Sequence, residues 1–145
     1  MEQGIVPSNK TNDFYIAHKL KAREIECPDS HTVMATPELL DAWTELRKSV
    51  SEYNGYDTPI IVNSGFRTWD YHVKLYKRLY RDKDKHWKDA ITERSRHLVG
   101  QALDMKTPNG LTTSKFEELA KLAGFTYTYI ITPDPLYGDI HADVR

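Results

Sequence analysis

Residues 95–106 read SRHLVGQALDMK, a stretch that combines a histidine, a glycine and an alternating segment with an aspartate. Between Gln101 and Lys106, one set of alternate residues is apolar and the other includes Asp104, which predicts a β-strand. His97 precedes this strand, and Asp104 follows seven residues later within it. Gly100 allows a tight turn or the close approach of another backbone, and the small Ala102 leaves space beside Asp104. An imidazole and a carboxylate so placed are candidate metal ligands.

A second predicted strand, from about Gly138 to Val144, supplies a third candidate ligand. Side chains alternate across a strand, so His141 shares one face with Asp139 and Asp143. His97, Asp104 and His141 together form a set of three ligands, which leaves one position of a catalytic zinc for water. One neighbouring carboxylate can act as a general base while the other orients a histidine, and spacing leaves open which does which.

The remaining elements indicate an α+β fold. Thr36 and Pro37 begin a helix that runs to about Ser51, and its apolar residues recur at helical spacing. A capping box at Ser114–Glu117 and Gly124 delimit another helix. Further predictions are a loose arm over 1–12, a short helix over 13–23, strands over 59–62 and 125–131, a helix over 69–81, and a loop with one helical turn over 82–95. We expect residues 1–145 to form a single domain with a small antiparallel central sheet flanked by helices.

Composition excludes some classes of partner. The formal net charge of −1 gives no global field toward nucleic acid, and no apolar run approaches the length that spans a bilayer. The start lacks a secretory signal pattern, and Cys27 is the single cysteine, so we expect synthesis and folding in a reducing cytoplasm. We also expect a monomer.

The string S-x-H-x-x-G-x-A-x-D over Ser95–Asp104 resembles the signature of the zinc D-alanyl-D-alanine carboxypeptidases, which share their fold with the hedgehog signalling domain. Other matching features are Ser64-Gly-Phe-Arg67, His141-Ala-Asp143 and Cys27-Pro-Asp29, so the similarity covers about residues 25–145. The resemblance implies one zinc ion on His97, Asp104 and His141, and it assigns Arg67 to the substrate or the developing oxyanion. Its implied substrate is the stem peptide of peptidoglycan, cut at D-Ala-D-Ala or at a neighbouring L,D bond.

One departure from the family pattern leaves two functions open. Many members place the catalytic acid three residues before the last histidine ligand, where this chain has Gly138. Asp139 is then the predicted base, with Asp143 as the substitute. The first function is a cell-wall peptidase, such as a phage-type lysin released by lysis, a virion-associated enzyme, or an enzyme that trims a cytoplasmic dipeptide. The alternative is a catalytically silent zinc-containing module that binds a partner or serves in virion structure.

Several candidate residues also have plain structural readings. Arg67 can pin the loop after its strand, and Asp143 can pair with Arg145 or Lys106. Ser95 and Tyr137 are candidates for substrate contact, although the default expectation for Ser95 is a hydrogen bond to the loop backbone. His72 is expected to be a packed core histidine.

Overall fold

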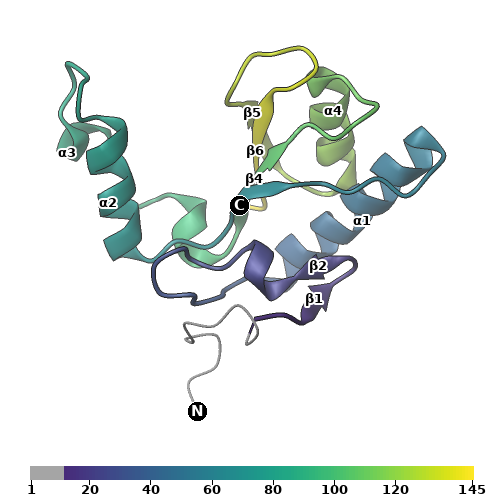
Figure 1. Ribbon diagram of the computed structural model, residues 1–145, viewed down its shortest axis with the longest axis horizontal. Helices are drawn as coiled ribbons and strands as arrows, with labels where there is room; N and C mark the ends of the chain where they lie inside the picture. The colour runs from purple at the N-terminus through teal and green to yellow at the C-terminus, as the bar shows by residue number, and fades with distance from the viewer. Residues whose placement is uncertain (1–11) are drawn as a thin grey trace.

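A computed structural model describes residues 12–145, which adopt an α+β fold with four α-helices and two small antiparallel sheets (Figure 1). The predicted arm over 1–12 lies outside the described residues except for Asn12. Asn12 is fully buried, and its side-chain amide donates to Glu26 Oε1 and to the carbonyl of His31, each at 2.8 Å. None of the helices in the described part of the chain is long and apolar enough to cross a membrane.

The main sheet has four strands in the order β3-β4-β6-β5, all antiparallel to their neighbours. Its central pair is β4 (Ala102–Lys106) and β6 (Asp139–Asp143), both close to their predicted ranges. The register sets Asp104 opposite His141 and Lys106 opposite Asp139. β5 (Tyr127–Ile130) and β3 (Val62–Ser64) lie at the edges.

The two faces of this central pair have different roles. Leu103 and Met105 of β4 and Ile140 and Ala142 of β6 are fully buried in the hydrophobic core. The alternation of side chains then puts Asp104 and His141 on the opposite face. The core therefore fixes the register that brings two candidate ligands together.

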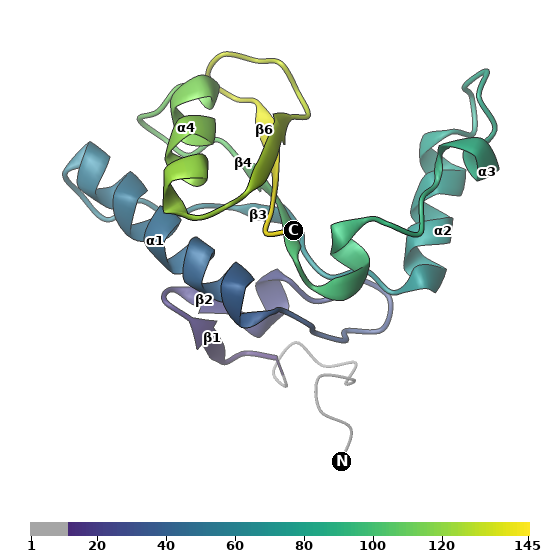
Figure 2. The ribbon, with the colours of Figure 1, turned by 180° about the vertical axis from the view of Figure 1, so that it is seen from behind.

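α1 (Pro37–Asn54) covers the core face together with α4 (Thr113–Ala123), as Figures 1 and 2 show. Thr36 caps α1 by accepting a hydrogen bond from the amide of Leu39, and Pro37 occupies its first turn. Gly55 ends the helix at φ +78°, a left-handed conformation that glycine adopts without steric cost. The start of the helix is as predicted, and the helix runs three residues beyond Ser51.

α4 begins earlier than its sequence pattern predicts. Thr112 is the N-cap, and its hydroxyl accepts from the amide of Lys115, so the predicted capping box at Ser114 is wrong. Thr113 instead turns its hydroxyl inward and donates to the carbonyl of Asp134 at 2.5 Å. Thr113 is therefore the first residue of α4, and its side chain ties the helix to the loop before β6.

α2 (Trp69–Leu79) and α3 (Trp87–Ala90) stand apart from the layer formed by α1 and α4, on the other side of the sheet (Figure 2). The range of α2 is close to its prediction, and α3 is the helical turn expected within 82–95. His72 is the one fully buried residue of α2, which confirms its reading as a packed histidine.

Two predictions of local structure are wrong. Residues 13–23 form no α-helix: β1 (Tyr15–Ala17) and β2 (Leu20–Lys21) make a hairpin, and η1 (Ala22–Glu24) follows as a 3-10 turn. Lys19 has φ +52°, which breaks a helix and suits the turn. The strand predicted over 59–62 instead runs over Val62–Ser64, where pairing with β4 is available.

Candidate metal centre

His97, Asp104 and His141 meet on the face of the sheet opposite the hydrophobic core. One ligand atom from each residue lies within 4.8 Å of the other two, so the group can hold a metal ion. Asp104 Oδ1 is the shared point: it lies 2.9 Å from His141 Nδ1 and 3.2 Å from His97 Nε2. The structure thus brings together the three predicted ligands from two strands and a turn.

The backbone around His97 fixes which of its nitrogens faces Asp104. His97 lies in η2 (Arg96–Val99), a 3-10 turn that ends at Gly100 with φ +69°. A Cβ at Gly100 would come within 2.7 Å of the Met34 carbonyl oxygen, so this glycine serves both functions expected of it. His97 Nδ1 donates to the carbonyl of Gly65 at 2.7 Å. That hydrogen bond leaves the lone pair of Nε2 directed at the carboxylate.

His97 Nε2 is buried and has no hydrogen-bond partner among the described residues. With Nδ1 as the donor to Gly65, the lone pair of Nε2 faces an ionised carboxylate oxygen at 3.2 Å, so two acceptors oppose each other. A buried acceptor without a donor is costly, and a cation between the two atoms removes that cost. The residues present, two imidazoles and one carboxylate, therefore fit a metal ion.

His141 is held from both sides by carboxylates. Its Nε2 donates to Asp143 Oδ2 at 2.8 Å, which leaves Nδ1 toward Asp104. Burial lowers the pKa of His141, but hydrogen bonds to Asp104 and Asp143 outweigh burial and raise it above its ordinary value. Asp143 is itself fully buried and also accepts from the Arg145 guanidinium at 2.8 and 2.9 Å. Of the two roles open to it, Asp143 has the geometry of the residue that orients a ligand histidine.

Asp104 is held in its ionised form. Burial raises the pKa of its carboxyl group, but the hydrogen bond with His141 and the contact with His97 hold it far below the usual range. The second oxygen, Oδ2, accepts from Arg67 Nη2 at 3.3 Å. Asp104 can therefore offer Oδ1 to a metal while Oδ2 is occupied by the protein.

Arg67 is more constrained than a free substrate-binding arginine. It is 8% exposed, and it donates to Ser64 Oγ at 3.1 Å as well as to Asp104. Its Nη1 also lies 3.5 Å from His72 Nδ1, which acts as acceptor because His72 Nε2 donates to the carbonyl of Thr92. Burial and the Arg67 charge lower the pKa of His72 to about 4, so this histidine is neutral. Arg67 thus orients Asp104 and retains further N–H groups that these contacts do not use.

Two tyrosines of β5 belong to the site and are not singled out by the sequence pattern. The ring of Tyr129 stacks on His141 with 4.7 Å between centroids, and Tyr127 meets the same imidazole edge-on at 6.3 Å. Both rings are partly exposed, so they form a wall beside the candidate ligands. These tyrosines become recognisable as site residues only from the pairing of β5 with β6, which sets Tyr129 opposite His141.

Asp139 lies on the same strand face as His141, one residue pair further along. Its two carboxylate oxygens accept from Asn63 Nδ2 at 2.9 Å and from Thr132 Oγ1 at 3.1 Å. The strand rise puts it about 7 Å along the strands from the Asp104–His141 pair. Asp139 therefore lies near the three candidate ligands and is not one of them.

Gly138 has no space for the acidic side chain that the family pattern places there. A Cβ would clash with the carbonyl oxygen of Thr132 and come within 2.7 Å of that of Asp134. The Gly138 amide also donates to Thr113 Oγ1, and its carbonyl accepts from the Thr107 hydroxyl at 2.7 Å. The loop before β6 is thus folded tightly against this position.

The two remaining candidates differ in position. Ser95 is the half-buried N-cap of η2, two residues before His97, and its side chain makes no hydrogen bond within the described residues. Tyr137 is 68% exposed and lines a separate cavity at the end of β4 that contains none of the three ligands. Ser95 is therefore a neighbour of His97 in the chain, and Tyr137 belongs to a different cavity.

Comparison with known proteins adds no family to these observations. No protein-family model matches the chain, and no curated protein sequence matches it significantly. Any function must therefore be inferred from the chemistry of the His97–Asp104–His141 group and the residues around it.

Proposed function

We propose that this protein is a zinc-dependent peptidase that hydrolyses the stem peptides of peptidoglycan. The observation that carries the proposal is the unpartnered, buried Nε2 of His97, which faces the same Asp104 oxygen as His141 Nδ1. Two imidazoles and one carboxylate are a ligand set that holds a catalytic zinc and leaves a coordination position open.

The proposed substrate class and the proposed fold type both come from the sequence resemblance. The signature over Ser95–Asp104 and the segments Ser64–Arg67 and His141–Asp143 resemble the zinc D-alanyl-D-alanine carboxypeptidases. Support from the structure is that all three segments converge on one face of the β3-β4-β6-β5 sheet. We accordingly propose a fold of the hedgehog and D-alanyl-D-alanine carboxypeptidase type, acting on the cell wall after release or from a virion.

The surrounding residues have distinct roles in this proposal. When bound, zinc supplies polarisation of the scissile carbonyl and acidification of water. Asp139 takes a proton from the attacking water and passes it to the leaving amine. Arg67 orients Asp104 and directs its remaining N–H groups at the developing oxyanion or at a substrate carboxylate. Asp143 fixes the tautomer and orientation of His141.

Two experiments, first of metal content and then of hydrolysis, test the proposal. Elemental analysis of purified protein should find about one zinc per chain, lost in His97→Ala and kept in His18→Ala, which removes an exposed histidine outside the site. Zinc-loaded protein should then cleave purified muropeptides, and Asp139→Ala should abolish cleavage while zinc stays bound. Wild type without zinc after reconstitution would refute the metal assignment.

A second candidate is a zinc-containing binding module without catalytic activity. It is favoured by one observation: Gly138 has no space for an acid, and both oxygens of the substitute Asp139 are already engaged by Asn63 and Thr132. This module binds zinc as the enzyme does but is inert on every muropeptide, and stable association with virion components would identify a structural role.

A further inference from the structure

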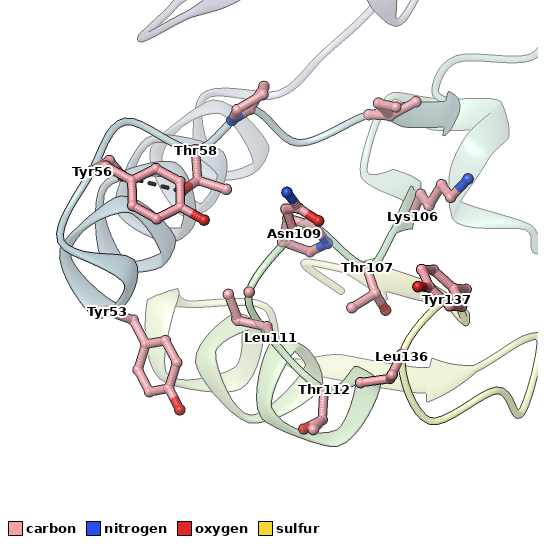
Figure 3. Close-up of a pocket in the computed structure, with 14 residues that line it drawn as sticks. Tyr53, Tyr56, Thr58, Lys106, Thr107, Asn109, Leu111, Thr112, Leu136 and Tyr137 are labelled. Carbon is pink, nitrogen blue, oxygen red and sulfur yellow. Dashed lines mark hydrogen bonds between the residues drawn. The ribbon is translucent and has the colours of Figure 1, made fainter.

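A cavity of about 740 Å³ opens beyond the end of β4, apart from the candidate metal centre (Figure 3). It is enclosed by the chain after α1, the loop between β4 and α4, and the loop before β6. Its volume lies within the usual range for sites that bind small molecules.

The cavity combines aromatic rings with polar groups that have no partner. Tyr56 and Tyr137 enter it from opposite sides, and they are 54% and 68% exposed (Figure 3). The side chains of Lys106 and Asn109 also line it, and none of these four side chains makes a hydrogen bond or ion pair within residues 12–145. Flat rings beside free amide, hydroxyl and ammonium groups match a sugar, because its apolar C–H faces stack on aromatics while its hydroxyl and acetamido groups need hydrogen-bond partners.

The cavity includes Lys106, the last residue of β4, a strand that also carries Asp104. Lys106 is paired with Asp139, and the next pair on the same face of these strands is Asp104 with His141. The strand rise makes this step about 7 Å. Tyr137, which also lines the cavity, lies two residues before Asp139 in the chain. A substrate that contacts both must therefore extend from the cavity past Lys106 and Asp139.

We propose that this cavity binds N-acetylated amino sugars of the peptidoglycan glycan strand. The inference rests on the proposed function, in which the peptide branch of the same polymer is the substrate. Sugar units between Tyr56 and Tyr137 would hold the glycan while its peptide extends past Asp139 to the metal centre. The catalytic domain then supplies its own affinity for the cell wall.

Titration of the metal-free protein with the trisaccharide of N-acetylglucosamine tests the proposal without reference to catalysis. Calorimetry should detect binding, and Tyr56→Ala and Tyr137→Ala should each weaken it about three- to tenfold. Tyr15→Ala is the matched control, because Tyr15 is 67% exposed on β1 and does not line the cavity, and it should leave the affinity unchanged. Circular dichroism confirms that each variant is folded.

The outcomes separate this proposal from the proposed function. Absence of trisaccharide binding by wild type, or equal affinity in all three tyrosine variants, overturns the sugar site even if zinc-loaded protein cleaves muropeptides. Binding that is weakened in Tyr56→Ala and Tyr137→Ala and preserved in His97→Ala supports the sugar site even if no peptide is cleaved.

Discussion

Zinc should stabilise this protein by an amount that His97 controls. A ligand that binds the native state alone at about 1,000 times its dissociation constant adds about 4 kcal/mol to the free energy of unfolding. For a domain of this size each kcal/mol raises the melting temperature by about 2–4 °C. We therefore expect zinc to raise the melting temperature of wild type by about 8–16 °C over a chelated sample.

His97→Ala should remove that increment at a small cost to the metal-free protein. The substitution removes the hydrogen bond to Gly65 and leaves a cavity, at a cost of about 3 kcal/mol. It also removes the unpartnered Nε2, and the loss of this unfavourable group restores about 1 kcal/mol or more to the free energy of unfolding. The metal-free difference between wild type and variant is then about 2 kcal/mol, and zinc should widen it to about 6 kcal/mol.

Thermal denaturation followed by circular dichroism measures both quantities, with and without chelator. His18→Ala serves as control, because its exposed side chain lies outside the site and its response to zinc should equal that of wild type. A zinc response that is equal in wild type and His97→Ala, or absent from both, would refute the assignment of His97 as a ligand.

Three further predictions address residues around the metal centre. His72 has a folded-state pKa of about 4 against 6.5 unfolded, so stability should fall by up to about 3 kcal/mol as the pH drops from 6.5 toward 4. Chemical denaturation of wild type and His72→Gln across this range should show the loss in wild type and a flatter profile in the variant. Gly138→Ala should lower the free energy of unfolding by about 1–3 kcal/mol, measured by urea denaturation, because its Cβ meets the Thr132 and Asp134 carbonyl oxygens. Asp143→Asn should weaken zinc binding about 10- to 100-fold in competition with a chromophoric chelator, and unchanged affinity would contradict its role on His141.

The elements best predicted from sequence are those with a strong local signal. α1 has an N-cap, a proline in the first turn and an apolar stripe, and the structure confirms its start at Pro37. β4 and β6 alternate clearly because one of their faces is buried, so their ranges and their ligand-bearing faces follow from pattern alone. The hairpin over residues 15–21 has no such signal: its strands are two and three residues long.

The part of the site that sequence could not predict depends on contacts between distant elements. Spacing does not reveal that Arg67 is tied to His72 and Asp104, because those partners lie on α2 and β4. Tyr129 reaches His141 through the pairing of β5 with β6. Nor does the sequence show why residue 138 is glycine, since the space is filled by carbonyl groups of the preceding loop.

The strand order has a consequence for how the protein is made. β6 follows β5 in the sequence, yet it lies between β4 and β5 in the finished sheet. Until it emerges, β5 has no neighbour to pair with, and the metal centre lacks His141. Closure of the sheet and completion of the ligand set are therefore one event in biosynthesis.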